Sequence, residues 1–182
     1  AFMEAYPDLK IELILTDRVI DPLEEGVDVT VRIGILQDSS LIARRLAPAR
    51  RVLVAAPAYL KRHGAPKNPD DLARHRCLVY GHTASLQRWH LTHEGKPIQA
   101  AVNSVLCSNN GDVLCAAAVG GQGITALPTF LVGPDIKAKR LRVVLPHYPP
   151  TSFGLYALYA PNRYLAAKTR LFIDFLAARF GD

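Results

Sequence analysis

The sequence predicts an α/β protein with two lobes, and three observations support this prediction. Apolar and polar side chains alternate with a period of two over residues 27–33, which is typical of a half-buried strand. Residues 165–180 place apolar side chains along one helical stripe, which indicates an amphipathic helix that covers a sheet. A hairpin pattern interrupts the middle of the chain, whereas strands and helices alternate at both ends. This order favours two lobes of α/β structure.

The first third of the chain is expected to contain strands joined by short helices. The apolar run 11–15 and the alternating run 27–33 predict two strands. Residues 21–26 between them have a proline near the start and a glycine at the end, which favours a short helix. Strand, helix and strand in this order form the unit of a parallel sheet. Residues 51–56 predict a further strand.

Two short helices and a strand follow. Residues 57–64 begin with proline and end with glycine, as many helices do. Asn68 can cap a helix over residues 68–75, because its side chain accepts backbone N–H groups and acidic residues come directly afterwards. Residues 77–80 then predict a strand.

The middle and the end of the chain contain more strands and one Ala-rich helix. Strands over residues 88–91 and 98–102 flank a glycine-containing turn and predict a hairpin. Residues 113–119 predict a helix that two glycines close. The other strands expected in this part of the chain are residues 105–107, 124–127, 140–145 and 154–160.

The composition fits an ordinary globular protein. The 182 residues are 49% hydrophobic and 21% charged, which is enough apolar material for a core. No apolar run approaches the roughly 20 residues that cross a bilayer, so a membrane protein is not expected. The three cysteines, Cys77, Cys107 and Cys115, form no C-x-x-C pair. This argues against a disulfide framework and a zinc knuckle, and it favours a cytoplasmic location.

The charge and the start of the chain are less informative. A formal net charge of +6 permits a polyanionic partner, but no nucleic-acid-binding motif accompanies it, so solvated surface charge is the preferred interpretation. The chain begins AFMEAYP, without a basic and apolar leader. We interpret this start as the middle of an element in a longer protein, with no signal peptide in view.

Gly121, Gly123 and Ala126 have the G-x-G-x-x-A spacing that binds dinucleotide pyrophosphates. That function requires a strand before the glycines and a helix after them, because the start of the helix supplies free N–H groups. Here the predicted order is reversed. We therefore expect the end of a helix and a tight turn at these glycines, and no bound cofactor.

The other end of the same predicted helix is a better candidate for binding. Residues 109–111 lie where a strand ends and a helix begins, which is a favoured place for small ligands. Ordinary helix capping explains them equally well, and Asp112 would repel an anion. Residues 16–17 and 34–35 also follow predicted strands, so all three segments are expected to line one crevice.

No pattern in the sequence predicts catalysis or a metal site. His90 and His93 are three residues apart, a spacing that directs them to opposite faces of a strand. The acidic pairs at residues 24–25 and 70–71 lie at expected helix ends, where capping explains them. The sequence contains no nucleophile elbow, zincin motif or phosphate-binding loop. We therefore expect no catalytic residue, no metal and no cofactor.

Six segments, taken together, resemble one family. They are FMEAYPDL at residues 2–9, DVTVRIG with DSSLIARRL at 28–46, AAPAYL with PDDLARHRCL at 55–78, SNNGD at 108–112, GQGITALP at 121–128 and FIDFL at 172–176. In this order, over nearly the whole chain, they are similar to the effector-binding domain of LysR-type transcriptional regulators.

The resemblance implies a type 2 periplasmic-binding-protein-like fold, in which each lobe is a mixed, mostly parallel sheet flanked by helices. On this pattern residues 1–76 and 157–182 form lobe I, without the family's first strand, and residues 77–156 form lobe II. Two crossover strands are expected to join the lobes, near residues 77–80 and 154–160. The family's N-terminal helix-turn-helix DNA-binding domain is not present in this chain.

The resemblance also implies a pocket between the lobes that binds a small-molecule effector. The positions that it assigns to this pocket follow predicted strands or begin a helix: Thr16, Asp17, Arg32, Ile33, Gly34, Ile35, Tyr80, Gly81, His82, Thr83, Ser108, Asn109, Asn110, Gly111, Asp112 and Pro128. The positive net charge is compatible with an anionic effector.

The function that the resemblance implies is effector sensing and dimerisation in a cytoplasmic transcription regulator. A homodimer is expected through head-to-tail contacts of lobe I with lobe II, and a tetramer is expected for the full protein. Residues 1–6 would then face the helix at residues 111–119 of the partner. The small side chains of residues 116–118 would permit close approach. DNA would bind only through the N-terminal domain.

Two other functions remain open at the level of sequence. A free-standing periplasmic solute-binding protein of a transporter shares the fold, and an export signal upstream would favour it, although the lack of a cysteine pair favours the regulator. An enzyme on the same fold would need an assembled acid, base and nucleophile, and the sequence presents no such set.

Overall fold

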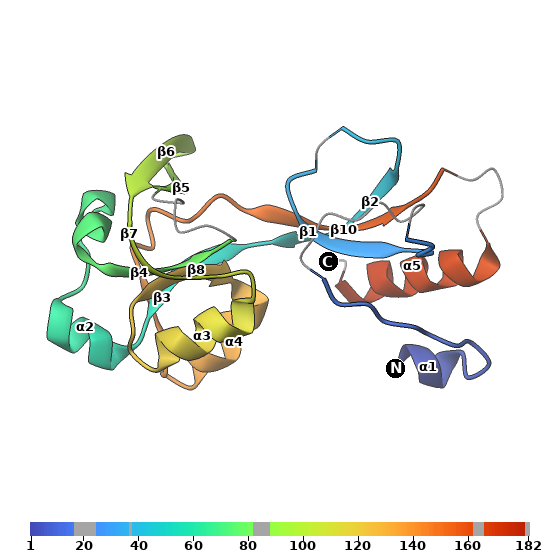
Figure 1. Cartoon of the computed structure of the whole chain (residues 1–182), viewed down its shortest axis with the longest axis horizontal. Helices are drawn as coiled ribbons and strands as arrows, with labels where there is room; N and C mark the ends of the chain where they lie inside the picture. Colours follow the sequence, from blue (N-terminus) through green and yellow to red (C-terminus); the bar gives the residue numbers. More distant parts are fainter. Residues whose placement is uncertain (17–24, 37, 82–87, 162–165, 181–182) are drawn as a thin grey trace. The chain divides into compact units, whose positions relative to one another are not determined.

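Two compact units make up the protein (Figure 1). The computed structural model describes residues 1–16, 25–36, 38–81, 88–161 and 166–180. The first unit comprises Ala1–Pro48 and Phe153–Asp182, and the second comprises Ala49–Ser152.

A three-stranded sheet lies at the centre of the first unit. Its strand order is β1 (Thr30–Gly34), β10 (Phe153–Tyr159) and β2 (Ile42–Ala49). Strands β1 and β10 are antiparallel. The amphipathic helix α5 (Ala167–Phe180), predicted from its apolar stripe, covers this sheet by packing Ile173 and Leu176 against Leu46 and Ala157. These four buried side chains form the core of the unit.

The short helix α1 (Phe2–Ala5) is attached to α5 through one aromatic ring. The ring of Phe2 lies 4.9 Å from that of Tyr6 and 5.1 Å from those of Phe172 and Phe175, measured between centroids. Edge-on aromatic contacts of this kind add to the free energy gained by burying the rings.

Two predictions for the first unit are wrong. Residues 11–15 form no strand, because a strand needs a hydrogen-bonded neighbour and no described residue pairs with this segment. Its side chains are exposed, with Leu15 at 85%. Because residues 11–15 form no strand, the predicted strand–helix–strand unit is not formed, and β1 pairs antiparallel with β10 instead. Most of the short helix predicted at residues 21–26 lies outside the described residues.

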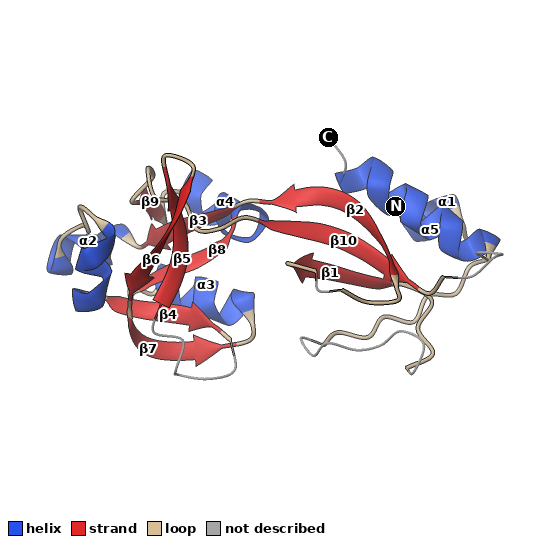
Figure 2. Cartoon of the chain, turned by 90° about the horizontal axis from the view of Figure 1, so that it is seen from above, coloured by secondary structure: helices blue, strands red, loops and turns tan. Residues whose placement is uncertain are grey.

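A five-stranded sheet lies at the centre of the second unit (Figure 2). Its strand order is β7 (Asn103–Ser108), β4 (Arg76–Tyr80), β8 (Ile124–Pro128), β3 (Arg51–Ala55) and β9 (Arg142–Val144). Strands β7, β4 and β8 run parallel, whereas β3 is antiparallel to both of its neighbours.

Both faces of this sheet are covered. The hairpin of β5 (Arg88–His93) and β6 (Lys96–Ala101) lies across one face, and helices α3 (Gly111–Val119) and α4 (Thr129–Lys137) lie on the other (Figure 2). Neighbouring residues of β3 show both layers, because successive side chains of a strand point to opposite faces. Leu53 packs in the cluster that contains Trp89 of the hairpin, and Val54 packs with Leu114 of α3.

Two short helices precede β4. Helix α2 (Pro57–His63) begins with proline and is followed by Gly64 at a φ of 78°, a left-handed conformation that favours glycine. The next helix, η1 (Pro69–Arg74), is of the 3-10 type. Asn68 caps it as predicted, and the carboxylate of Asp71 accepts the N–H of Asn68 in return.

The boundary between the units differs from the expected one. Residues 49–76, expected in lobe I, belong to the second unit, because β3 pairs with β8 and β9 there. The chain passes between the units at residues 48–49 and 152–153. Residues 77–80 therefore belong to β4 inside the second sheet and are not a crossover strand.

Two further elements were not predicted. Strand β2 has four exposed residues at its start, so it lacks a clear apolar alternation. Helix α4 contains Gly133 and Pro134, which weaken the sequence signal for a helix. No helix in the described part of the chain has the length and apolar content to span a membrane.

Candidate functional site

Three parallel strands of the second unit end at one edge of the sheet. In β4 and β7, Tyr80 lies beside Ser108, and the N–H of Gly81 donates to the carbonyl oxygen of Ser108 at 3.0 Å. Strand β8, on the other side of β4, ends at Pro128. The structure therefore brings together the predicted site residues that follow these strands. The carboxyl edge of such a sheet is where α/β proteins commonly bind ligands.

The turn from β7 into α3 is organised by two polar side chains. The N–H of Asn110 donates to the hydroxyl of Ser108 at 3.1 Å. The side-chain oxygen of Asn110 accepts the N–H groups of Asp112 and Val113 at 2.9 and 3.1 Å, which caps the helix. Ser108 and Asn110 thus shape the site.

Asn109 differs from its neighbours because its side chain is exposed and has no hydrogen bond to any described residue. An amide offers both donors and an acceptor. Among Ser108, Asn109 and Asn110, Asn109 is therefore the residue whose side chain is available to a ligand.

Gly111 and Cys107 fix the surroundings of the turn. A methyl group at Gly111 would lie 2.8 Å from a terminal carbon of Leu131, so α3 and α4 approach each other closely here. The thiol of Cys107 lies 3.2 Å from the carbonyl oxygen of Gly81. The Cys107 contact joins the ends of β4 and β7, and the lack of a side chain at Gly111 lets α3 lie against α4.

The predicted site residues of the first unit lie along β1. Arg32 lies opposite Tyr156 of β10, and Gly34 lies opposite Gly154. Ile35, just after the strand, is 70% exposed. Thr16 is exposed as well, and Asp17, His82 and Thr83 lie outside the described residues.

Sequence reasoning missed two residues near the predicted positions. Tyr156 lies beside Arg32, and its ring lies so close to Gly154 that a methyl group there would be 2.3 Å from it. Arg51 lies opposite Pro128 and donates to the carbonyl oxygen of Ala126 at 3.0 Å. Strand pairing between distant segments reveals these residues, and no local pattern in the sequence does.

Burial shifts the pKa values of Arg51, Cys77 and Cys115. The pKa of Arg51 is lowered to about 10 by desolvation, and that of Cys77 is raised to about 12 for the same reason. The pKa of Cys115 is raised to about 11 by burial and by Asp135, whose carboxylate lies 3.5 Å from the thiol. Both cysteines are therefore thiols at neutral pH and poor nucleophiles.

The backbone geometry explains the two glycines of the G-x-G-x-x-A segment. As predicted, they follow helix α3 and precede strand β8. Gly121 has a φ of 72°, and a methyl group at Gly123 would lie 2.4 Å from the carbonyl oxygen of Arg76. This close approach allows β8 to pair with β4 directly after the turn.

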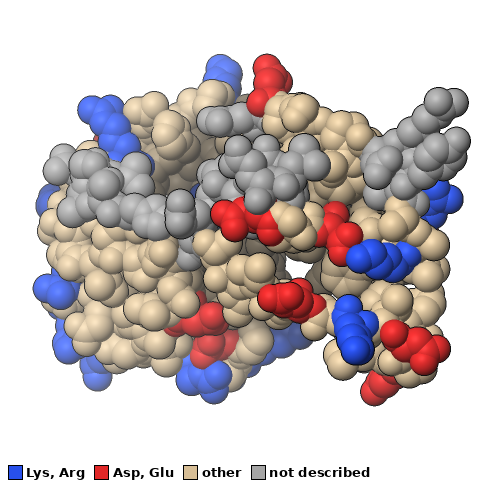
Figure 3. All heavy atoms as spheres, turned by 45° about the vertical axis from the view of Figure 1, so that its right-hand side comes forward, with Lys and Arg blue, Asp and Glu red and all other residues tan. Residues whose placement is uncertain are grey.

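The face shown in Figure 3 has no concentrated basic patch, and the described residues contain no cluster of metal ligands. Acidic and basic side chains occur together on the face shown in Figure 3, so the net charge of +6 is not gathered into one basic patch there. Within the described ranges, no three His, Cys, Asp or Glu side chains come together in a way that could hold a metal ion.

Comparisons with known proteins agree on one family. The family model described as LysR substrate binding domain matches residues 1–181. The HTH-type transcriptional regulator DmlR of Escherichia coli K12 is 34% identical over 185 residues, which cover 100% of this chain and 59% of that protein. The chain spans about 60% of the length of the curated relatives it matches.

Solved structures of such regulators have the same fold. The regulatory domain of CrgA, a LysR-type transcriptional regulator from Neisseria meningitidis, matches with a TM-score of 0.85 at 32% identity, covering 99% of this chain and 88% of that one. Full-length AphB, the Vibrio cholerae virulence activator, matches with a TM-score of 0.83 at 32% identity, covering 98% and 61%.

The predicted mixed α/β architecture of the periplasmic-binding-protein type is thereby confirmed, and the solute-binding protein of a transporter is not favoured. The chain belongs to the LysR substrate-binding domain family.

Proposed function

We propose that this chain is the effector-sensing and dimerisation domain of a LysR-type transcriptional regulator in the cytoplasm. The observation that carries this proposal is the family match over residues 1–181. The relatives are regulators of the HTH type, and the chain spans about 60% of their length. We assign DNA binding to the part of such a regulator that this chain does not span, and we propose no catalytic step.

The effector site that we propose in the second unit is the carboxyl edge of β7, β4 and β8. Tyr80, Gly81 and Asn109 would contact the small molecule there, together with Pro128. Ser108 and Asn110 support the site, because their hydrogen bonds hold the turn that presents Asn109. Asp112 makes the edge less favourable for an anion, since its carboxylate already lies in the first turn of α3.

On the first unit, residues 32–35 and Thr16 are proposed as ligand contacts. Strand β1 presents Arg32 beside Tyr156, and a guanidinium next to a phenol suits a carboxylate or an aromatic ring. Tyr156 is thus added to the residues expected from the sequence.

The effector would regulate the protein by binding one of its conformers more tightly than the other. A ligand shifts a conformational equilibrium only when it binds one conformer more tightly than the other. We therefore propose that the effector favours one conformer of the regulator, which then binds DNA differently.

The dimer that we propose pairs α1 of one protomer with α3 of its partner, head to tail. Apolar side chains on both helices are exposed, with Met3 at 65% and Val113 at 49%. Ala116 is exposed too, whereas Ala118 is buried in the core of its own unit and would not contribute as expected. Val113→Glu should therefore convert a dimer into a monomer in light scattering without unfolding the chain.

Ligand screening tests the sensing function. Small organic acids and amino acids are screened by thermal denaturation of the chain, and each hit is titrated by calorimetry. Asn109→Ala should weaken binding by about tenfold, which corresponds to the loss of one hydrogen bond to the ligand. Asn103→Ala is the matched control, because Asn103 is an exposed asparagine at the opposite end of β7. Equal loss in both variants would refute the assigned site.

A further inference from the structure

A solvent-open cavity of about 410 Å³ lies in the second unit, away from the carboxyl edge of β7, β4 and β8. The residues that line it come from the end of α2, from η1 and from the segment between them: His63, Ala65, Lys67, Asp71, Arg74 and His75. His75 directly precedes β4, so the cavity lies at the amino end of this strand. The five residues of β4 span roughly 13 Å, and the proposed effector site is at the strand's other end.

A buried histidine contributes a hydrogen-bond donor to this cavity. His75 is 7% exposed, and its Nδ1 lies 3.1 Å from the hydroxyl of Tyr59. That hydroxyl accepts the N–H of Arg76 at 2.9 Å. We infer that it donates its own proton to Nδ1 of His75, because the hydroxyl is buried and Nδ1 is the acceptor beside it. The neutral ring then carries its proton on Nε2.

The Nε2 atom of His75 is available to a ligand. No described residue forms a hydrogen bond with it. Nε2 is also accessible to solvent, because it is not one of the fully buried side-chain atoms that lack a hydrogen bond. Because His75 lines the cavity, a molecule there can accept this N–H.

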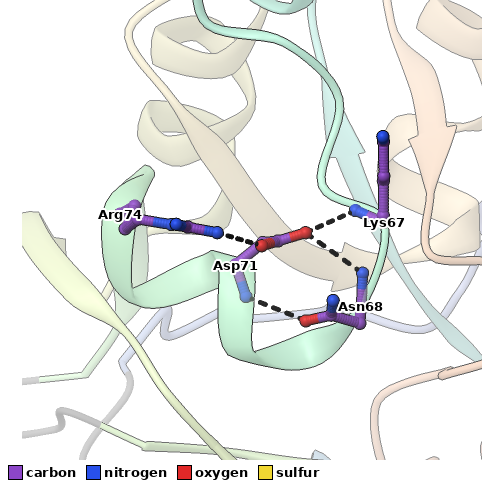
Figure 4. Close-up of polar contacts among 4 residues, drawn as sticks. All are labelled: Lys67, Asn68, Asp71 and Arg74. Carbon is purple, nitrogen blue, oxygen red and sulfur yellow. Dashed lines mark hydrogen bonds and ion pairs between the residues drawn. The ribbon is translucent and has the colours of Figure 1, made fainter.

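The acidic residue of the cavity is already satisfied. One oxygen of Asp71 accepts the N–H groups of Lys67 and Asn68, at 2.8 and 3.3 Å, and the other forms an ion pair with Arg74 (Figure 4). These donors lower the pKa of Asp71, so its carboxyl group stays ionised. Its charge is offset by Arg74, and its oxygens have little capacity left for another cation.

The other charged side chains of the lining, Arg74 and Lys67, are cationic. The side chain of Arg74 is 82% exposed and uses one N–H for Asp71, so other N–H groups of its guanidinium are left for a ligand. The ring of His63 is held against Tyr59, with centroids 4.6 Å apart, and Lys67 completes the lining. Arginine, lysine and imidazole N–H donors are the groups that bind carboxylates and phosphates.

We propose that this cavity binds a small oxyanion, a carboxylate or a phosphate, through His75, Arg74 and His63. The site is separate from the proposed effector site and does not depend on it. Such a site would let an ion act on the second unit from the amino end of β4.

Nuclear magnetic resonance of the 182-residue chain, labelled with ¹⁵N, tests this proposal. Inorganic phosphate and acetate are titrated separately, with chloride at equal ionic strength as the reference, and the signals of the His75 ring are followed. We expect a saturable shift of these signals with at least one of the two oxyanions. Saturation by phosphate alone or by acetate alone would identify which oxyanion the site prefers.

Matched variants locate the site. Arg74→Gln and His63→Gln should each weaken binding by about tenfold, as the loss of one hydrogen bond to the ligand implies. The controls Arg142→Gln and His90→Gln remove exposed side chains of the same types elsewhere in the unit and should bind as the unaltered chain does. The proposal is overturned if neither oxyanion shifts the His75 signals more than chloride does, or if all four variants bind equally.

Discussion

The hydroxyl of Tyr59 links two segments of the second unit, because it is hydrogen-bonded to Nδ1 of His75 at 3.1 Å and accepts the N–H of Arg76 at 2.9 Å. Tyr59 is 1% exposed and His75 is 7% exposed, so water cannot readily replace these bonds. The contact holds α2 against the start of β4.

Tyr59→Phe should therefore lower the free energy of unfolding. The change leaves Nδ1 of His75 and the N–H of Arg76 without their partner, and such a loss costs about 1–3 kcal/mol. Urea denaturation measures it. Tyr6→Phe is the control, because the hydroxyl of Tyr6 has no hydrogen bond to a described residue. Equal stability of the two variants would show that the Tyr59 contact contributes nothing.

Stability should also fall in mild acid. Burial lowers the pKa of His75 below its ordinary value of 6.5, with smaller effects of Asp71, which raises it, and of His63 and Arg74, which lower it. As the pH drops below 6.5, the unfolded chain takes up a proton at this ring before the folded chain does. Folding therefore loses free energy on acidification, by at most about 1.4 kcal/mol per pH unit for one proton.

Urea midpoints measured from about pH 8 to about pH 5 test this dependence. The variant His75→Gln should have a flatter profile than the unaltered chain, because it lacks the titrating ring. Identical slopes would mean that His75 is not the group responsible. The carboxyl group of Asp71, whose pKa is lowered from 3.8, acts in the same direction but only at more acidic pH.

The two neighbouring asparagines of the α3 turn should have separable roles. Asn110→Ala removes the helix cap and should cost about 0.5–2 kcal/mol of stability. Asn109→Ala should leave the unfolding free energy unchanged, since its side chain is exposed and bonds to no described residue. Thermal denaturation of both variants decides between these roles. A destabilised Asn109→Ala variant would assign that residue to structure as well.

Two glycines should respond in opposite ways to alanine. At Gly123 the added carbon would lie 2.4 Å from the backbone oxygen of Arg76, so β8 or β4 must shift and the chain should be strongly destabilised. At Gly133, inside α4, nothing lies within 4 Å of the added carbon. Alanine favours a helix there by about 1 kcal/mol. Chemical denaturation should show a loss at 123 and a gain at 133, and the reverse order would contradict the backbone geometry.

Much of the second unit could be predicted because its signals are local. A proline and a following glycine mark α2, and Asn68 with Asp71 forms a capping box at η1. The turn at Glu94 and Gly95 adopts positive φ angles, as the hairpin pattern implied. In each case a few adjacent residues determine the conformation.

The features that could not be predicted depend on distant residues. Residues 11–15 have the composition of a strand, but a strand also needs a partner, and composition carries no information about that. The unit boundary differs from the expected one because it depends on the pairing of β3 with β8, strands that are far apart in the chain. Pairing across the sheet likewise places Arg51 beside Pro128.

The candidate site also combines features that adjacent residues predict with features that only the structure reveals. The sequence pointed to residues 108–112 because a strand precedes and a helix follows, and the parallel ladder brings Tyr80 beside Ser108. Individual hydrogen bonds determine which polar side chain caps the helix and which one is left to contact a ligand. That distinction between Asn110 and Asn109 required the structure.

The central claim is that a small molecule binds at the carboxyl edge of β7, β4 and β8. Amide signals of the labelled chain, recorded while a compound from the thermal screen is added, test it most directly. The claim predicts saturable shifts at Tyr80, Gly81 and Asn109 that weaken in Asn109→Ala but not in Asn103→Ala. A compound that binds saturably, yet leaves all three signals unchanged, would contradict it.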